Sequence, residues 1–364
     1  METPQDIRKM VPIIKIASNA CNMRCLYCYY HLEDQGEIKV MSEKVLTELI
    51  AKTLAFSDLD PVQFIWHGGE PMLAGMDLYK RILSIEEGLQ DGKKIENHIQ
   101  TNATLISKEW AEFFAQNKFE VGISLDGPEE VQNSCRVFSN GQGSFRTVMI
   151  GLERLHDVNI YPSAIALVTR ASLGQERKIF DFFANAGIKR FLLKPCYELS
   201  PTGEPTKFSV SPGEFSQFMI GILEVWLERD DPSISIRNLA QMMVGIVGGK
   251  PSLCEFSGKC WLCPKVEFDG IVGPCDSLSH QSYKFGNIAD NTWEEIFQSK
   301  VFFQLLSGLQ KSRSLCSGCE WLKNCHNHCP KYSYSEKNGA WVRNIFCDAK
   351  KEIFLRLRQV IESV

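Results

Sequence analysis

The sequence predicts an α/β fold built around a parallel sheet. Short apolar or β-rich runs alternate with longer segments of helical spacing over residues 1–200, and this alternation is typical of βαβ units. The chain has 364 residues, of which 44% are hydrophobic and 23% charged, so it can bury a sizeable core. Periodicity alone leaves open whether the strands close partly into a barrel or form an open, doubly wound sheet.

The predicted elements follow one another in a regular order. The predicted strands are residues 11–17, 62–66, 97–100, 120–125, 161–168 and 190–193. The predicted helices are residues 42–55, 77–89, 107–115, 145–158, 176–186 and 214–227. Residues 200–211 contain Pro and Gly and are predicted to form a loop. The change of composition that follows predicts two domains, residues 1–232 and 233–364.

Charge and hydropathy exclude several classes of function. Lys and Arg total 40 against 44 Asp and Glu, a net charge of −4, so we expect no nucleic-acid partner. Pro12 and Lys15 interrupt the first apolar run, and no window approaches the roughly 18 apolar residues of a membrane span. We therefore expect a cytoplasmic protein without a membrane partner. In a reducing cytosol its 14 cysteines are expected to be metal ligands or catalytic groups.

Cys21, Cys25 and Cys28 directly follow the first predicted strand. Three Cys ligands on a [4Fe–4S] cluster leave one iron open, and an open metal position marks a reactive site. Buried core cysteines, or a zinc site completed by a distant ligand, are the alternatives. Functional groups of such folds lie at the carboxyl ends of strands. The next predicted strand ends are polar: His67-Gly68-Gly69-Glu70-Pro71, Gln100-Thr101-Asn102 and Ser124-Leu125-Asp126-Gly127-Pro128.

The CxxxCxxC spacing, with Tyr27 before the last Cys, resembles the radical S-adenosylmethionine (radical SAM) superfamily. The resemblance implies a partial (βα)6 TIM barrel, a [4Fe–4S] cluster on these cysteines, and SAM as the source of a 5′-deoxyadenosyl radical that abstracts hydrogen from the substrate. It implies SAM contacts by Tyr27, Gly68, Gly69, Glu70, Ser124, Asp126, Arg136 and Tyr197. The glycines would let the backbone approach the ligand, and Arg136 would bind the SAM carboxylate. Taken alone, Gly68-Gly69 and Asp126-Gly127-Pro128 could be turns and Arg136 a surface residue.

Nine of the 14 cysteines fall between Cys254 and Cys347. Their spacing resembles the SPASM extension of radical SAM enzymes, which implies two auxiliary [4Fe–4S] clusters and three clusters in all. The first auxiliary cluster is predicted on Cys254, Cys260, Cys275 and Cys329, and the second on Cys316, Cys319, Cys325 and Cys347. Cys196 and Cys263 are left for packing, and Cys135 for packing or hydrogen-atom donation. A zinc ribbon on Cys316, Cys319, Cys325, His326, His328 and Cys329 is the alternative.

The resemblance covers nearly the whole chain and leaves two branches. Anaerobic sulfatase-maturating enzymes oxidise a sulfatase Cys or Ser to formylglycine, and the similar segments here are residues 28–31, residues 100–105 and Cys275-Asp276. Peptide maturases crosslink an aromatic ring to another residue, and the similar segments are His67 with the following GGEP, residues 136–145, residues 276–278 and residues 332–339. The chain departs from both branches at Gln132, where His is usual, at Ala103, where Gly is usual, and at His326-Asn327-His328, which replaces a Gly-rich stretch.

We predict a radical SAM oxidoreductase that abstracts hydrogen from a ribosomally made precursor peptide and forms a cyclophane-type crosslink. Formylglycine formation on a sulfatase is the alternative, and a non-catalytic iron–sulfur or zinc protein is the alternative from another class. Asp276 is predicted to be the general base, or else a hydrogen-bonding residue beside a cluster. The expected partners are a peptide or protein substrate and an electron donor of flavodoxin or ferredoxin type. Because 20 residues precede Cys21, we expect no N-terminal leader-binding module.

Overall fold

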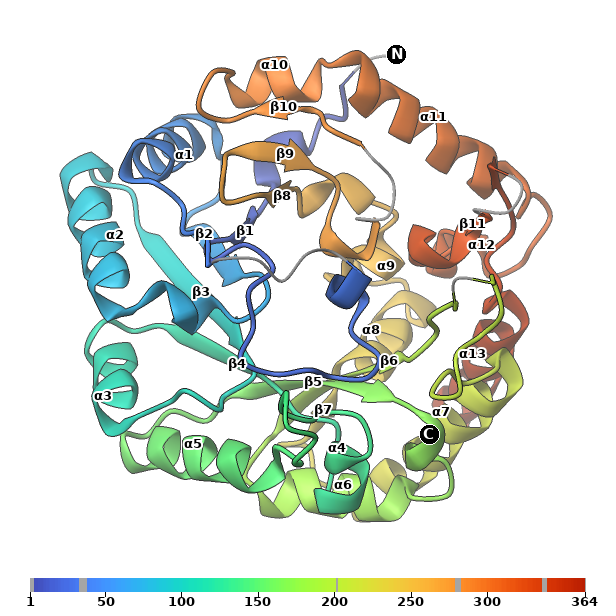
Figure 1. Cartoon of the computed structure of the whole chain (residues 1–364). Helices are drawn as coiled ribbons and strands as arrows, with labels where there is room; N and C mark the ends of the chain where they lie inside the picture. Colours follow the sequence, from blue (N-terminus) through green and yellow to red (C-terminus); the bar gives the residue numbers. More distant parts are fainter. Residues whose placement is uncertain (1–2, 33–37, 201, 279–282, 336–338, 364) are drawn as a thin grey trace. The chain divides into compact units, whose positions relative to one another are not determined.

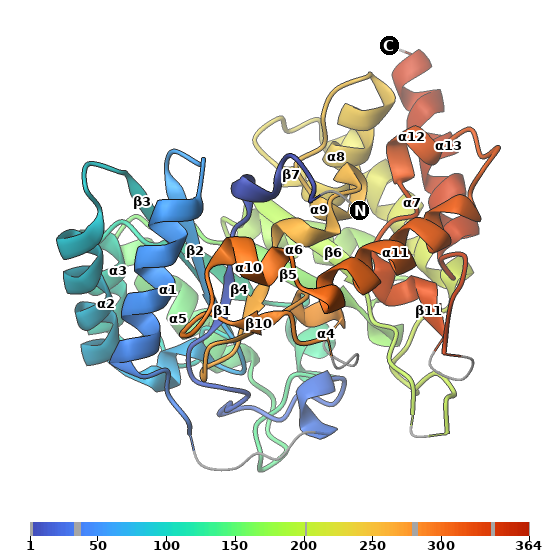
Figure 2. The ribbon, with the colours of Figure 1, turned by 90° about the horizontal axis from the view of Figure 1, so that it is seen from above.

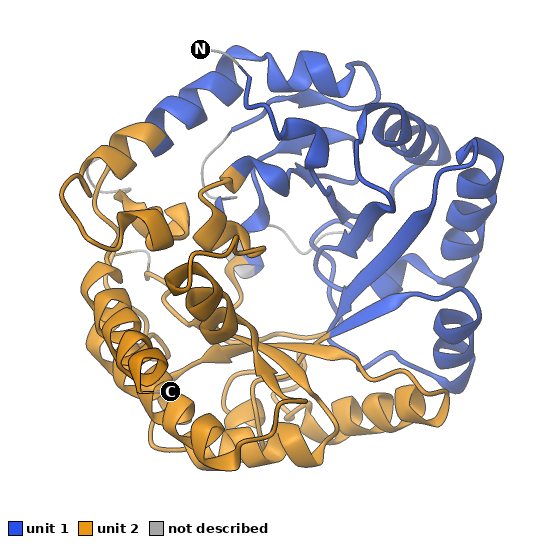
Figure 3. Cartoon of the chain, turned by 180° about the vertical axis from the view of Figure 1, so that it is seen from behind, with its two compact units in different colours: residues 1–22, 30–122, 261–309 blue, residues 23–29, 123–260, 310–364 orange. Residues whose placement is uncertain are grey.

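Helices and strands alternate along most of the computed structural model, as the sequence predicts (Figure 1, Figure 2). The structure describes residues 3–32, 38–200, 202–278, 283–335 and 339–363. Residue 201 of the predicted loop, residues 336–338 of the segment similar to peptide maturases and the side chain of His31 lie outside the described part. The chain divides into two compact units that interleave along the sequence (Figure 3).

Unit 1 comprises residues 1–22, 30–122 and 261–309. Its elements are β1 (Ile13–Lys15), α1 (Glu43–Phe56), β2 (Val62–His67), α2 (Met76–Leu89), β3 (Ile95–Thr101), α3 (Lys108–Gln116), β8 (Lys265–Val266), β9 (Ile271–Gly273), β10 (Gly286–Asn287) and α10 (Trp293–Phe297). Its strands are ordered β10-β9-β8-β1-β2-β3. The run from β8 to β3 is parallel, whereas β9 and β10 are antiparallel.

The sheet of unit 1 joins residues that are far apart in the sequence. Ile13 of β1 lies opposite Ile65 of β2 on one side and Lys265 of β8 on the other. Residues after position 260 therefore extend the sheet that the first strand begins. The domain boundary between residues 232 and 233 follows a change of composition in the sequence and stays a prediction.

Unit 2 comprises residues 23–29, 123–260 and 310–364. Its elements are α4 (Glu129–Asn133), α5 (Phe145–Asp157), β5 (Ser163–Val168), α6 (Glu176–Asn185), β6 (Arg190–Pro195), α7 (Pro212–Arg229), β7 (Ser235–Ile236), α8 (Arg237–Ile246), α9 (Cys254–Ser257), α12 (Leu322–Cys325), β11 (Tyr334–Ser335), β12 (Ala340–Trp341) and α13 (Cys347–Glu362). Strand β4 (Glu120–Ser124) and helix α11 (Lys300–Ser314) begin in unit 1 and end in unit 2. β5, β6 and β7 are parallel, and α6 and α13 both pack against α7.

Short polar side chains determine where several helices begin. The hydroxyls of Ser42 and Ser107 accept hydrogen bonds from the backbone N–H groups of Val45 and Trp110, so α1 and α3 begin directly after these serines. The predicted starts of both helices are thus correct to within one residue. None of the helices in the described part of the chain combines the length and apolar character needed to cross a bilayer.

Candidate active site

The motif after β2 packs against the segment that leads into Cys21. The backbone N–H of Gly69 donates to the carbonyl oxygen of Ser18 at 3.1 Å. A Cβ atom on Gly69 would lie 2.1 Å from the carbonyl oxygen of Ala20, and Gly68 has a φ of +125°. Both positions therefore require glycine, because two backbone segments meet here. This contact positions the chain just before the predicted cluster ligand, and a contact of these glycines with SAM stays a prediction.

Glu70 is completely buried and links the ends of β2 and β3. Its Oε1 accepts hydrogen bonds from the backbone N–H of Met72 at 3.1 Å and the hydroxyl of Thr101 at 2.8 Å, and its Oε2 from the backbone N–H of Asn102 at 2.7 Å. Burial raises the pKa of Glu70 to about 7, although these three hydrogen bonds oppose the shift. The described contacts thus give Glu70 a structural role, and the predicted contact with SAM stays a prediction.

The side chain of Asn102 connects this strand end to Cys21. Its Nδ2 lies 3.7 Å from Cys21 Sγ and donates to Oδ1 of Asn22 at 2.9 Å. Hydrogen bonds to ligand sulfurs are one means by which a protein tunes an iron–sulfur cluster. The sequence marks Asn102 only as part of a polar strand end, and the contact with Cys21 becomes visible only in the structure.

Asp276, the predicted base, is buried in unit 1 and faces two basic side chains. Its Oδ2 lies 3.3 Å from Nδ1 of His67, at the end of β2, and its Oδ1 lies 3.9 Å from Nζ of Lys265 in β8. Lys265 also pairs with Glu267 at 2.7 Å, and Glu267 lies 3.2 Å from the buried Lys15 of β1. The fold thus brings together His67 and Asp276, which the sequence places in separate motifs. Both predicted roles of Asp276 fit this geometry.

Three predicted SAM contacts form one buried cluster in unit 2. The hydroxyl of Tyr27 donates to Oδ2 of Asp126 at 2.5 Å, and Nε of Arg136 lies 3.0 Å from the same oxygen. The other oxygen of Asp126 accepts a hydrogen bond from the backbone N–H of Leu167 at 2.9 Å. Burial raises the pKa of Tyr27 well above its usual value, so its hydroxyl keeps the proton that it donates. Asp126 therefore holds Tyr27 and Arg136 in place, and contacts of the three with SAM stay predictions.

The alternative that Arg136 is a surface residue is wrong. Its residue surface is only 8% exposed, and its guanidinium lies 5.4 Å from the centre of the Tyr27 ring. A buried cation needs a compensating partner, and Asp126 provides it.

Gln132 stands where the families that the chain resembles usually have His. It supports Asp126, the carboxylate that holds Tyr27 and Arg136. It is completely buried, its Oε1 accepts from the backbone N–H of Asp126 at 2.9 Å, and its Nε2 donates to the hydroxyl of Ser144 at 3.1 Å. The amide can donate and accept at once, so both of its polar atoms have partners. The sequence alone marks Gln132 as a departure, and its supporting role is a finding of the structure.

The segment that carries Cys25 and Cys28 runs beside residues 135–138. The backbone N–H of Leu26 donates to the carbonyl of Cys135 at 2.8 Å. Burial raises the pKa of the Cys25 thiol to about 11, although Arg136 opposes the shift. Binding to a metal centre deprotonates such a thiol at neutral pH, which fits its predicted role as a ligand.

The other two predicted SAM contacts, Ser124 and Tyr197, both lie in unit 2. Ser124 ends β4, and Tyr197 follows β6 and packs edge-on against Phe346, with ring centres 5.6 Å apart. The ligand sets of the first cluster and of the first auxiliary cluster are divided between the units: Cys21 and Cys275 belong to unit 1, and Cys25, Cys28, Cys254, Cys260 and Cys329 to unit 2. These two sets stay predictions.

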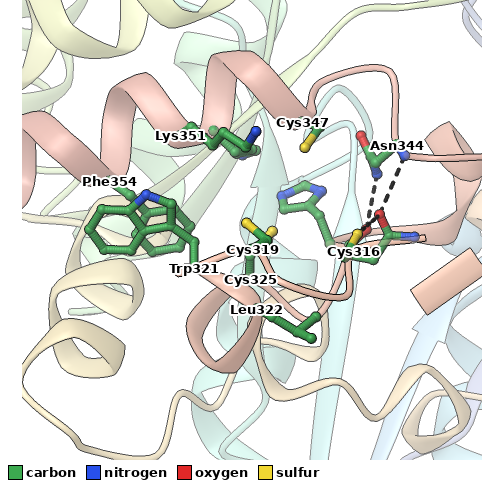
Figure 4. Close-up of a pocket in the computed structure, with 12 residues that line it drawn as sticks. Cys316, Cys319, Trp321, Leu322, Cys325, Asn344, Cys347, Lys351 and Phe354 are labelled. Carbon is green, nitrogen blue, oxygen red and sulfur yellow. Dashed lines mark hydrogen bonds between the residues drawn. The ribbon is translucent and has the colours of Figure 1, made fainter. Parts of the chain in front are cut away.

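The four predicted ligands of the second auxiliary cluster line one pocket in unit 2 (Figure 4). Cys316, Cys319, Cys325 and Cys347 surround about 360 Å³ of empty space, part of which is open to solvent, and Trp321, Leu322 and Phe354 form apolar walls. Burial raises the pKa of Cys325 to about 12 and also raises that of Cys316 and Cys347. Four thiols around one pocket are the donor set of a [4Fe–4S] cluster, so these residues fit the predicted group.

A zinc ion and a four-iron cluster require different arrangements of their sulfur ligands. Zinc holds its sulfur ligands about 2.3 Å from a single point, whereas each Cys of a four-iron cluster binds a different iron. In the described part of the chain, no three or more Cys, His, Asp or Glu side chains come close enough to hold a single metal ion. The choice between the cluster and the zinc ribbon at this pocket stays a prediction.

The turn between Cys325 and Cys329 explains why a Gly-rich stretch is usual there. His326, Asn327 and His328 have φ values of +51°, +67° and +57°, a region that favours glycine. The side chain of Asn327 stabilises the turn, because its Oδ1 accepts from the backbone N–H of Asn344 at 3.3 Å and its Nδ2 donates to the Ser312 hydroxyl at 2.5 Å. Polar side-chain contacts therefore replace glycine as the means of forming this turn.

Two family models match the chain at the positions of these motifs. The model of the Radical SAM superfamily matches residues 16–192, and that of SPASM, an iron–sulfur cluster-binding domain, matches residues 254–325. These matches confirm the predicted combination of a radical SAM core and a SPASM extension.

Known proteins resemble the chain over nearly its full length. It is 32% identical over 355 residues to a cysteine-type anaerobic sulfatase-maturating enzyme of Clostridium perfringens, with 94% of each chain covered. It is 30% identical over 365 residues to a serine-type anaerobic sulfatase-maturating enzyme of Bacteroides thetaiotaomicron, with 94% of this chain and 88% of the other covered.

Solved structures show the same fold. Native anSMEcpe with bound AdoMet and the Cp18Cys peptide matches with a TM-score of 0.87 at 28% identity, covering 97% of this chain and 99% of the other. Streptococcus suis SuiB bound to the precursor peptide SuiA matches with a TM-score of 0.68 at 17% identity, covering 93% and 75%, which shows a similar fold alone. The α/β fold class is thus confirmed. The chain belongs to the radical SAM superfamily, carries a SPASM iron–sulfur cluster-binding domain and is homologous to the anaerobic sulfatase-maturating enzymes.

Proposed function

We propose that this chain is an anaerobic sulfatase maturase that oxidises a Cys or Ser side chain of its substrate protein to formylglycine. The observation that carries the proposal is the full-length similarity to sulfatase-maturating enzymes of both the cysteine and the serine type. This was the alternative prediction from the sequence. The main prediction, crosslinking of a precursor peptide, has weaker support, because the likeness to SuiB concerns the fold alone.

The proposed cofactors are three [4Fe–4S] clusters and SAM, on the ligand sets predicted above. When bound, SAM and the first cluster would supply the radical that removes a hydrogen atom from the substrate β-carbon. Arg136 is proposed to bind the carboxylate of SAM, since a guanidinium matches a carboxylate in bidentate geometry. Asp126 and Tyr27 would fix the orientation of Arg136 through the contacts described above.

Asp276 is proposed to accept the second hydrogen of the substrate as a proton. After one hydrogen atom has left the β-carbon, formation of a C=S or C=O bond requires loss of one electron and of the S–H or O–H proton; water then replaces sulfur in the Cys case. A carboxylate within reach of that proton is a suitable base. His67 at 3.3 Å and Lys265 at 3.9 Å would orient the carboxylate of Asp276. The auxiliary clusters are proposed to receive the electron.

The proposal is tested with the anaerobically reconstituted full chain, SAM, a reductant and peptides that carry the Cys or Ser maturation site of a sulfatase. We expect about twelve irons per chain, release of 5′-deoxyadenosine, and a peptide that reacts with a hydrazide because it contains an aldehyde. Oxidation of Ser to formylglycine and formation of a crosslink both remove two hydrogens, so the mass alone does not separate them. An oxidised product that fails to react with the hydrazide would favour crosslinking.

The role of Asp276 is tested by Asp276→Asn, which keeps the size of the side chain but cannot accept the proton. We expect continued cleavage of SAM with little aldehyde formed. Asp269→Asn is the matched control, because Asp269 is exposed on the neighbouring turn, and it should turn over like the unchanged chain. Normal aldehyde formation by Asp276→Asn would remove Asp276 from the mechanism.

A further inference from the structure

Lys350 lies in the wall of the pocket that the four cysteines form. It follows Cys347 by three residues on α13, so both side chains are on the same face of the helix. The residue is only 3% exposed. Its ammonium lies 5.3 Å from the centre of the Phe215 ring and 5.6 Å from that of Phe256, and cation–π contacts of this kind replace part of the lost hydration. A buried lysine is costly, so its position beside four thiols points to a role.

The charge of Glu255 acts on this ammonium within unit 2. Burial lowers the pKa of Lys350, whereas Glu255, Cys325 and Cys329 raise it, and Lys194 lowers it further. Cys325 is a predicted ligand of the second auxiliary cluster and Cys329 of the first. Of these two cysteines, Cys325 lines the same pocket as Lys350.

Glu255 is a buried carboxylate whose charge acts on Lys350. Its Oε2 lies 2.9 Å from Nε2 of His328, which also lines the pocket. Both side chains are almost fully buried, at 12% and 2% exposure. Glu255 therefore places a negative charge beside His328 of the pocket wall, and loss of the Lys350 charge or of the Glu255 charge changes the net charge near the pocket in opposite directions.

We propose that Lys350 raises the reduction potential of the iron–sulfur cluster bound in this pocket by stabilising its reduced form. A cluster becomes more negative when it gains an electron, and a positive charge in a wall of low dielectric favours that state. This effect would suit a cluster that receives the electron released during substrate oxidation. The inference rests on the proposed cluster at this site and is independent of which substrate the enzyme oxidises.

The neighbouring lysine provides a matched control. Lys351 also lines the pocket, but its side chain is 40% exposed and lies 3.5 Å from Asp348. Solvent and counterions screen an exposed charge. Loss of the Lys351 charge should therefore change the potential far less than loss of the Lys350 charge.

The experiment is a redox titration of the reconstituted full chain, followed by electron paramagnetic resonance. The signal that disappears in Cys316→Ala identifies the cluster in this pocket. We expect Lys350→Met to shift the midpoint of that signal to a more negative potential, Lys351→Met to leave it in place, and Lys350→Arg to restore it. An unchanged midpoint in Lys350→Met, or an equal shift in both Met variants, overturns the inference.

A second variant keeps the test decisive if Lys350→Met does not retain its iron. Glu255→Gln removes the compensating negative charge and should shift the same midpoint to a more positive potential; no shift, or a shift to a more negative potential, contradicts the inference. The iron content distinguishes a wrong inference about Lys350 from the absence of the proposed cluster. If a variant with Cys316, Cys319 and Cys347 all changed to Ala binds as much iron as the unchanged chain, the proposed cluster itself is wrong.

Discussion

Glu70 in unit 1 and Asp126 in unit 2 are both buried carboxylates that follow a strand, yet their partners differ. Among its described contacts, Glu70 accepts hydrogen bonds from two backbone N–H groups and one hydroxyl, all of which are neutral. Asp126 accepts hydrogen bonds from the hydroxyl of Tyr27 and one backbone N–H, and it faces the guanidinium of Arg136 at 3.0 Å. Glu70 and Asp126 are both predicted to contact SAM, yet their electrostatic surroundings differ.

The difference shows two ways of burying a carboxylate at a strand end. Neutral donors do not offset the loss of hydration around Glu70, so its pKa rises to about 7 and the group holds a proton in mildly acidic solution. Beside Asp126 a cation supplies the compensation. Burial alone would lower the pKa of Arg136, but the neighbouring carboxylate of Asp126 raises it, so the guanidinium stays charged. Unit 2 therefore contains a fixed ion pair, and unit 1 a titratable group.

The largest expected effect comes from removing the cation of the ion pair. Arg136→Met leaves Asp126 buried without its partner, which should destabilise the chain by about 3–5 kcal/mol. The measurement is urea unfolding of the full chain under anaerobic conditions. Arg146→Met is the control, because Arg146 lies 3.7 Å from Glu129 with 88% of its side chain exposed, and its loss should cost less than about 1 kcal/mol. Similar small costs for both variants would mean that the buried pair contributes little.

Glu70 should make the stability depend on pH. An unfolded glutamate releases its proton near pH 4.5, whereas folded Glu70 keeps it up to about pH 7. The folded state thus binds more protons than the unfolded state in this window, and the free energy of unfolding falls as the pH rises from 4.5 to 7, by about 3 kcal/mol in total.

The measurement compares urea unfolding at pH 5 and pH 8 for the unchanged chain and for Glu70→Gln. Glu86 also has a pKa that burial raises to about 7, so part of the pH dependence should remain in the variant. The quantity of interest is therefore the difference between the two chains. Equal pH dependence in both would show that Glu70 is ionised across the whole range.

The hydrogen bond from the Tyr27 hydroxyl to Asp126 should stabilise the chain more than the hydrogen bond from the Thr101 hydroxyl to Glu70. At pH 6, Tyr27→Phe removes a donor to an ion-paired carboxylate and should cost about 1.5–3 kcal/mol, whereas Thr101→Val removes a donor to a largely protonated carboxyl and should cost about 0.5–1.5 kcal/mol. Unfolding of both variants at the same pH gives the comparison. If Thr101→Val costs as much as Tyr27→Phe, the surroundings of the two carboxylates differ less than their contacts indicate.

The positions of most elements before residue 193 could be predicted, because the spacing of apolar residues and the helix-capping residues there can be read directly from the sequence. The predicted helix at 77–89 corresponds to α2 at Met76–Leu89. In contrast, β8 has two residues and no period, and its place beside β1 depends on tertiary contacts. The sequence therefore indicates that the later region binds clusters but not that residues 261–309 extend the first sheet.

The candidate site also contains residues that the sequence indicates and residues that only the structure reveals. The resemblance to the SPASM extension grouped the four cysteines that line the pocket in unit 2, and their role as ligands stays a prediction. Asn102, Gln132 and Lys350 were missed, since a single polar residue gains its role only from the segment that folds against it. The preference for crosslinking rested on short differences such as His67, and the comparisons with known proteins favour the other branch.

The smallest expected effect concerns Ala103, in the turn that presents the partners of Glu70. Ala103 has a φ of +63° and is completely buried. Ala103→Gly relieves about 1–2 kcal/mol of backbone strain, but it loses about 0.8 kcal/mol of methyl burial and gives the unfolded chain about 0.4–1 kcal/mol of extra freedom. We therefore expect a net change close to zero. The same substitution at Ala111, buried within α3, relieves no strain and should cost about 1–2 kcal/mol. Urea unfolding of the two variants measures the difference, and equal losses would mean that the turn beside Glu70 carries no strain for glycine to relieve.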